Sequence, residues 1–157
     1  MRGCEITLAL LLLPALVLAF PGGGPDGYAN NPPNLNSCIA CHDSYPLNGG
    51  LGGVIIGGIN TRYFPGELSE IYVVMGDAGF DHWGFQLTAL DADNNSAGIF
   101  VMPDEFSSVS ENTPPEPDYV NQTEAGVLEG DDFGRWYFEW IGPPPGTGPV
   151  TLYVVGM

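Results

Sequence analysis

Residues 82–90, HWGFQLTAL, alternate between apolar and polar side chains over their whole length. One face would carry the apolar side chains of Trp83, Phe85, Leu87 and Ala89. The other face would carry His82, Gln86 and Thr88. A period of two residues is typical of a β-strand with one buried face. We therefore expect a strand here whose outer face presents His82 beside Gln86 and Thr88.

Similar short stretches recur along the rest of the chain. We expect further strands near residues 54–56, 67–74, 98–102, 119–120, 135–140 and 150–155. Turns rich in Gly, Pro, Asn and Asp separate them, and residues 91–95 (DADNN) are one such turn rather than a calcium loop, because the Gly and distal Glu of an EF-hand are missing. Residues 103–130 are polar and predict a long connection. Six or seven short strands predict an all-β, immunoglobulin-like antiparallel sandwich.

The first 19 residues have the features of a secretory signal peptide. A single Arg precedes a short apolar run, which Pro14 interrupts, and small residues stand before a cut after Ala19. The run is short for a bilayer span. We expect export to the cell surface or beyond it, with no transmembrane segment after cleavage. The predicted organisation is a signal peptide (1–19), a Gly/Pro/Asn-rich N-terminal segment (20–50) and a sandwich domain (51–157).

The charge of the chain is strongly negative. The formal net charge is −16, with 19 acidic residues, no lysine and three arginines. Cleavage would remove Arg2 and Glu5, which leaves Arg62 and Arg135 as the cationic side chains. Nucleic acid is excluded as a partner, because binding to phosphate needs cations. Such a surface is typical of a soluble, self-repelling extracellular protein.

Residues 37–42, SCIACH, hold two cysteines followed directly by a histidine. Cys4 would leave with the signal peptide, so Cys38 and Cys41 are the mature cysteines. The pattern C-x-x-C-H is typical of one covalently attached haem c, with Cys38 and Cys41 in thioether bonds and His42 as the proximal iron ligand. Three alternatives stay open. They are a small-loop disulfide, a zinc site that lacks further ligands, and a redox dithiol without its usual strand and helix.

The second axial ligand has few candidates. His82 is the other histidine of the chain, and alternation places it on the outer face of its strand. If the N-terminal segment lies across that face, His82 would be the distal iron ligand. Met75 and Met102 are the alternatives, and a methionine ligand would raise the reduction potential.

Several blocks, in their order, resemble the choice-of-anchor V domain family, whose domain is similar to the Reeler domain. They are the C-x-x-C-H motif, 46–50 (PLNGG), 64–67 (FPGE), 84–91 (GFQLTALD), 136–143 and 150–153 (VTLY). The resemblance covers about residues 25–156. It implies an exported, Reeler-like sandwich with an irregular N-terminal haem-binding loop. The chain departs from the family in two respects: it lacks a histidine in the segment 119–123, and it stops at residue 157, where relatives continue into a further strand.

These features predict an exported mono-haem c-type cytochrome that transfers electrons with a redox partner protein and is not an enzyme. A missing last strand would leave an edge beside residues 150–155. Residues 20–28 of a neighbour would add to that edge and build a homo-oligomer or filament, unless they form a linker. The competing hypothesis is a structural or adhesive surface module with a Cys38–Cys41 disulfide and no haem. A haem peroxidase or gas sensor would need an open iron position. A hydrolase is disfavoured, because no Ser/His/Asp set is available.

Overall fold

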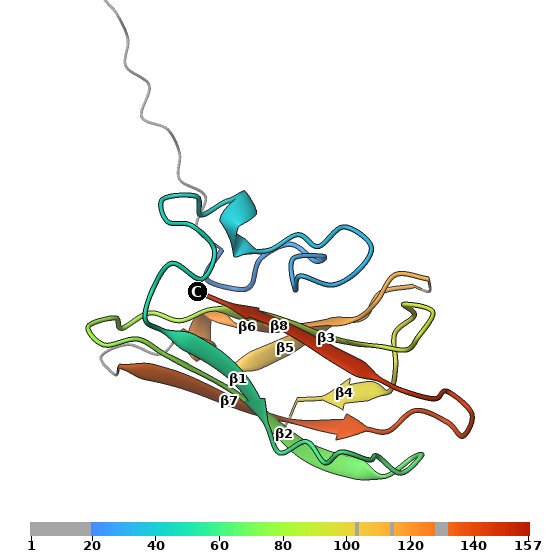
Figure 1. Cartoon of the computed structure of the whole chain (residues 1–157). Helices are drawn as coiled ribbons and strands as arrows, with labels where there is room; N and C mark the ends of the chain where they lie inside the picture. The colour runs from blue at the N-terminus through green and yellow to red at the C-terminus, as the bar shows by residue number, and fades with distance from the viewer. Residues whose placement is uncertain (1–19, 103, 114, 128–131) are drawn as a thin grey trace, which may run out of the picture.

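The computed structural model describes residues 20–102, 104–113, 115–127 and 132–157, so the predicted signal peptide lies outside the described residues. Two four-stranded antiparallel sheets pack face to face (Figure 1). The first has the order β1-β2-β7-β4, with bounds Gly53–Gly57, Leu68–Gly76, Phe133–Ile141 and Ile99–Val101. The second has the order β5-β6-β3-β8, with bounds Ser107–Ser110, Tyr119–Gln122, Phe85–Leu90 and Thr151–Gly156. The predicted all-β antiparallel sandwich is confirmed.

The core between the sheets follows the alternation of β3 and β7. The residues predicted to face inward, Trp83, Phe85, Leu87 and Ala89, are buried. Trp136, Phe138 and Trp140, at alternate positions of β7, are buried with them. The ring of Phe85 lies 4.8 Å from that of Trp136, measured between centroids. The indole N–H of Trp136 donates to the carbonyl of Gly126 at 2.9 Å, so the buried ring leaves no polar atom unpaired. Alternating aromatic residues therefore fill the sandwich and satisfy their own polar groups.

The turn after β3 is confirmed, and it changes the sheet that the chain follows. The carboxylate of Asp91 accepts hydrogen bonds from the backbone N–H groups of Asp93 and Asn95, both at 2.9 Å. After a single bridge between Leu90 and Ser96, the chain crosses to the first sheet. There β4 pairs with β7 instead of returning along β3. The turn thus connects the two layers.

The region 103–130 contains more structure than its polar composition predicts. Strand β5 pairs with β6 over four residues, from Ser107 opposite Gln122 to Ser110 opposite Tyr119. The strand is three-quarters serine and shows no apolar alternation, so its pairing with β6 determines its conformation. The strand predicted within this connection near residues 119–120 is confirmed as β6, whereas β5 was not predicted.

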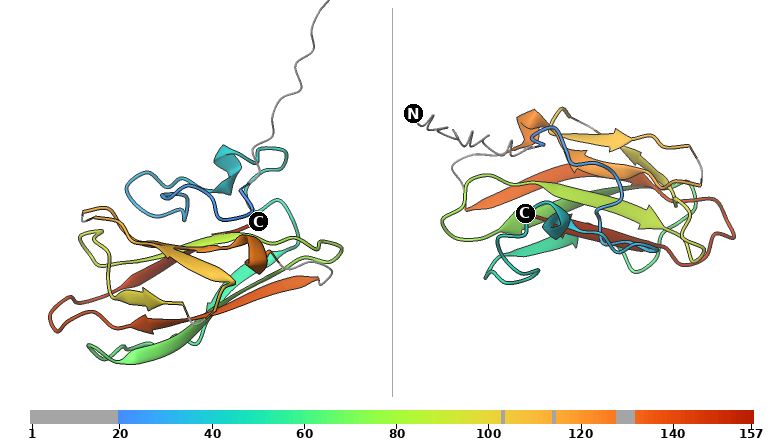
Figure 2. Two further views of the ribbon diagram at one scale, coloured as in Figure 1. Left: turned by 180° about the vertical axis from the view of Figure 1, so that it is seen from behind. Right: turned by 90° about the horizontal axis from the view of Figure 1, so that it is seen from above.

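The N-terminal segment covers the outer face of the second sheet, which can be seen in Figures 1 and 2. Gln86 and Thr88, predicted on that face, are 4% and 0% exposed. Gln86 accepts a hydrogen bond from the backbone N–H of Tyr28 at 2.5 Å and donates to the carbonyl of Pro25 at 2.9 Å. Further along the segment, the Asn31 amide donates to the hydroxyl of Tyr119 at 3.1 Å. Side chains of the sheet therefore bind the backbone and side chains of the segment that covers them.

Strand β8 lies at the edge of the second sheet, as predicted for residues 150–155. It pairs with β3 over six residues. Residues 20–28, expected to be a linker or to extend onto a neighbour, belong to the segment that packs on the chain's own sheet. Assembly through the β8 edge stays a prediction. Within the described residues, no helix has the length and apolar character needed to cross a membrane.

Candidate functional site

The N-terminal segment presents the C-x-x-C-H motif on one short turn. A 3₁₀ turn, η1, spans Cys38–Ala40. The backbone N–H groups of Cys41 and His42 both donate to the carbonyl of Cys38, at 3.2 and 2.9 Å. The turn is too short for a helix dipole to matter, and its role is geometric. It brings the two sulfur atoms and the imidazole to the same side of the segment.

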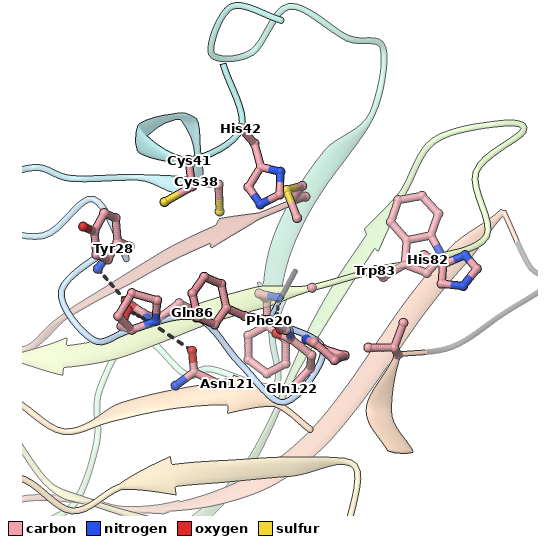
Figure 3. Close-up of a pocket in the computed structure, with 17 residues that line it drawn as sticks. Phe20, Tyr28, Cys38, Cys41, His42, His82, Trp83, Gln86, Asn121 and Gln122 are labelled. Atoms are coloured by element: carbon pink, nitrogen blue, oxygen red, sulfur yellow. Dashed lines mark hydrogen bonds between the residues drawn. The ribbon is translucent and has the colours of Figure 1, made fainter. Parts of the chain in front are cut away.

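These three side chains line a cavity of about 300 Å³ between the segment and the second sheet. Figure 3 shows Cys38, Cys41 and His42 on one side of the cavity, with the His42 ring turned into it. The apolar walls include Phe20, Pro25, Trp83, Phe85, Val127 and Met157. This volume is at the lower end of the range found for small-molecule and cofactor sites, which are mostly apolar with a few placed polar groups.

The polar side of the cavity comes from two glutamines and an asparagine. Gln86 donates to the side-chain oxygen of Asn121 at 3.0 Å. Gln122 accepts from the backbone N–H of Phe85 at 2.9 Å and donates to the carbonyl of Phe20 at 3.5 Å. Sequence reasoning did not assign these residues to the site. The sequence feature that could have identified Gln86, Asn121 and Gln122 is that they are uncharged polar residues on strands of the second sheet.

His82 lines the same cavity as His42, but from a different position than predicted. Strand β3 begins at Phe85, so His82 lies in the preceding loop and the prediction of a strand from residue 82 is wrong at that end. The backbone pair between Gly84 and Met157 lies two residues after His82 in the chain. The His82 side chain is 57% exposed, and its Nδ1 lies 2.8 Å from Asp81 Oδ1. Figure 3 shows it beside Trp83, across the cavity from His42.

The three methionines near the sandwich differ in their relation to the cavity. Met75 is 3% exposed within the core between the sheets. Met102 packs against that core and accepts a hydrogen bond from the Ser107 hydroxyl at 3.2 Å. Neither of these predicted alternatives lines the cavity, whereas Met157, which sequence reasoning missed, does.

The two thiols are free and differ in their surroundings. Cys38 is half-buried and Cys41 is exposed, and no bond joins them. Burial raises the pKa of the Cys38 thiol, with hydrogen bonding to its own backbone acting in the opposite direction. Over the part of the chain that the structure describes, no three His, Cys, Asp or Glu side chains converge as a metal-binding group.

The donor set and the cavity fit a covalently attached haem. Two thiols and an imidazole lie at one end of a cavity whose walls are mostly apolar. Apolar walls suit the faces of a porphyrin, and imidazole suits iron. The residues that would hold the group are Cys38 and Cys41, through sulfur, and His42, through the iron.

Among known proteins, similarity to this chain was found in solved structures. No family profile matches the chain, and no curated protein matches it. Two crystal structures of the human F-spondin reeler domain are similar to it, with 26% and 25% identity and TM-scores of 0.46 and 0.47. The matched regions cover 66% and 68% of this chain, and 72% and 73% of the two F-spondin chains. The Reelin-N domain of F-spondin is 28% identical, with a TM-score of 0.46, over 66% of this chain and 69% of that domain.

Proposed function

We propose that this protein is an exported mono-haem c-type cytochrome that transfers electrons with a redox partner. The observation that carries the proposal is that Cys38, Cys41 and His42 line one cavity on the outer face of the second sheet. The haem, when bound, supplies a centre that gains and loses one electron. The protein supplies attachment, one axial ligand and an apolar surrounding, which together set the potential.

Attachment is an addition that needs no oxidant. Cys38 and Cys41 would hold the group, each sulfur adding to one carbon of a vinyl group while the thiol hydrogen goes to the other carbon, so that nothing would leave. His42 follows Cys41 directly, so its imidazole would be tethered next to the second bond as an iron ligand.

The sandwich holds the attachment segment in place. Its outer face binds the segment through Gln86, Gln122 and Tyr119, which contact Pro25, Tyr28, Phe20 and Asn31. These contacts would give a bound cofactor a fixed surrounding. A small reorganisation on electron transfer is the expected benefit.

The test is the covalent haem itself. Protein expressed with its export signal and a haem attachment system should show a sharp Soret band and haem staining after denaturing electrophoresis. The double variant Cys38→Ser with Cys41→Ser should lose the stain, while Ile39→Ala, within the motif but without a donor atom, should keep it. Colourless protein, with a mass two hydrogens short because Cys38 and Cys41 are joined, would refute the proposal and favour the structural surface module.

A further inference from the structure

We propose that Met157 supplies the second axial ligand of the haem, through its thioether sulfur. The inference rests on the proposed function, because it concerns the same cavity. It replaces His82, which the sequence favoured, with a residue that the sequence did not suggest. Three observations carry it: the strand register at the end of β8, the face to which residue 157 belongs, and the surroundings of His82.

The register fixes the position of Met157. Phe85 of β3 lies opposite Gly156 of β8. One residue further, the backbone N–H of Met157 donates to the carbonyl of Gly84, and the N–H of Gly84 donates to the carbonyl of Met157, both at 2.9 Å. This reciprocal pair continues the antiparallel ladder. The backbone of Met157 is therefore fixed by hydrogen bonds within the sheet.

Alternation then selects the face. A Cβ built on Gly156 would lie 2.1 Å from Met75 Cε, so position 156 faces the core between the sheets. Successive side chains in a strand point to opposite faces. Position 157 accordingly faces outward, toward the side that the N-terminal segment covers, and Met157 lines the cavity with His42. Its partner Gly84 has no side chain to compete for the same space.

His82 is less suited to the position. It lies beyond the paired part of β3, and its ring nitrogen Nδ1 is engaged with Asp81 at 2.8 Å. Figure 3 shows its ring beside Trp83, while the His42 ring turns into the cavity. Drawing this exposed imidazole across the cavity would break its contact with Asp81. Met157 is a neutral, apolar side chain that is 51% exposed, and covering it with a porphyrin face buries apolar surface at no cost in charge.

The experiment compares three haem-loaded variants with the wild type. Met157→Leu keeps the volume and apolar character but removes the sulfur. His82→Ala removes the competing ligand, and Met102→Leu is the matched control, because Met102 lies outside the cavity. Each protein is examined for covalent haem, for the weak near-infrared charge-transfer band of thioether-ligated ferric haem, and for its midpoint potential.

The wild type should show the band. Met157→Leu should lose it and become high-spin, with a lower potential, because methionine ligation raises the potential. His82→Ala and Met102→Leu should retain both properties. A haem-loaded Met157→Leu protein with an unchanged spectrum overturns the inference, as does conversion to high spin in His82→Ala. Both outcomes leave the proposed function intact, whereas absence of covalent haem from the wild type removes the proposed function itself.

Discussion

Replacement of Gln86 by leucine should release the N-terminal segment from the sheet without unfolding the sandwich. Gln86 is 4% exposed, and its side-chain amide contacts both the segment and the neighbouring strand. Its oxygen accepts from Tyr28 N–H, and its nitrogen donates to the Pro25 carbonyl and to Asn121. Leucine has a similar size but cannot make any of these bonds.

The magnitude follows from counting the three hydrogen bonds that the Gln86 side chain makes. Two of the three, those to Tyr28 and Pro25, exist only while the segment is docked. At roughly 1 kcal/mol each, their loss favours the undocked segment by about 2 kcal/mol. The undocked population should therefore rise about 30-fold. The bond to Asn121 lies within the sheet, and its loss lowers the stability of the whole fold instead.

Native-state hydrogen exchange separates these two effects. Amides of residues 20–36 should exchange faster in Gln86→Leu by about the same factor, because local opening limits their exchange. Thr88→Val is the matched control. Thr88 is fully buried on the same strand and donates to the Asp118 carbonyl at 2.7 Å, a contact outside the segment. That control should lower global stability and leave residues 20–36 protected as before. Unchanged exchange of these residues in Gln86→Leu would refute the reasoning.

Two further predictions concern the sandwich. Phe138→Ala should lower the free energy of unfolding, measured in urea, by about 3–5 kcal/mol, because the side chain is fully buried. Tyr137→Ala, at the neighbouring position on the outer face, should lower it far less. Equal losses in the two variants would contradict the assigned faces. The pKa of Asp91 is held below its usual value, chiefly by the backbone N–H of Asn95, so its NMR titration should fall below that of an ordinary aspartate. Because the pKa of Asp91 is lower in the folded state, its stabilising effect is present above the ordinary aspartate pKa and is lost as the pH falls through the folded-state pKa. Asp91→Asn should remove this part of the pH dependence of Tm. A Tm profile identical to that of the wild type would contradict the prediction.

The sandwich architecture could be predicted from the sequence because two strands show a clear alternation of apolar residues. In β3 and β7, large apolar residues occur at every second position, and no helical reading fits them. Strand β5 could not be predicted in this way. Its serines carry no periodic signal, and its conformation comes from β6, a partner nine or more residues away in sequence. Local pattern finds strands that are buried on one face, and it misses those defined by their neighbours.

The sequence could predict that Cys38, Cys41 and His42 lie together, but not what else surrounds them. The spacing of Cys38, Cys41 and His42 pointed to one group of ligands, and the structure places all three on one cavity. The place of Met157 depends on strand register, which a single sequence does not reveal. Likewise, nothing local shows that Gln86 is buried, because its cover lies about 60 residues earlier in the chain.

The cavity is built from both ends of the described chain, and this has a consequence for the order of folding. Phe20 and Gln122, which are joined by a hydrogen bond and both line the cavity, are 102 residues apart, and Met157 also lines it. Contacts of such sequence separation carry a large loop-closure entropy and form after more local ones. Synthesis proceeds from the N-terminus, so residues 38–42 emerge well before the strand that completes their surroundings. Until β8 joins the sheet, these residues are therefore reachable by other proteins.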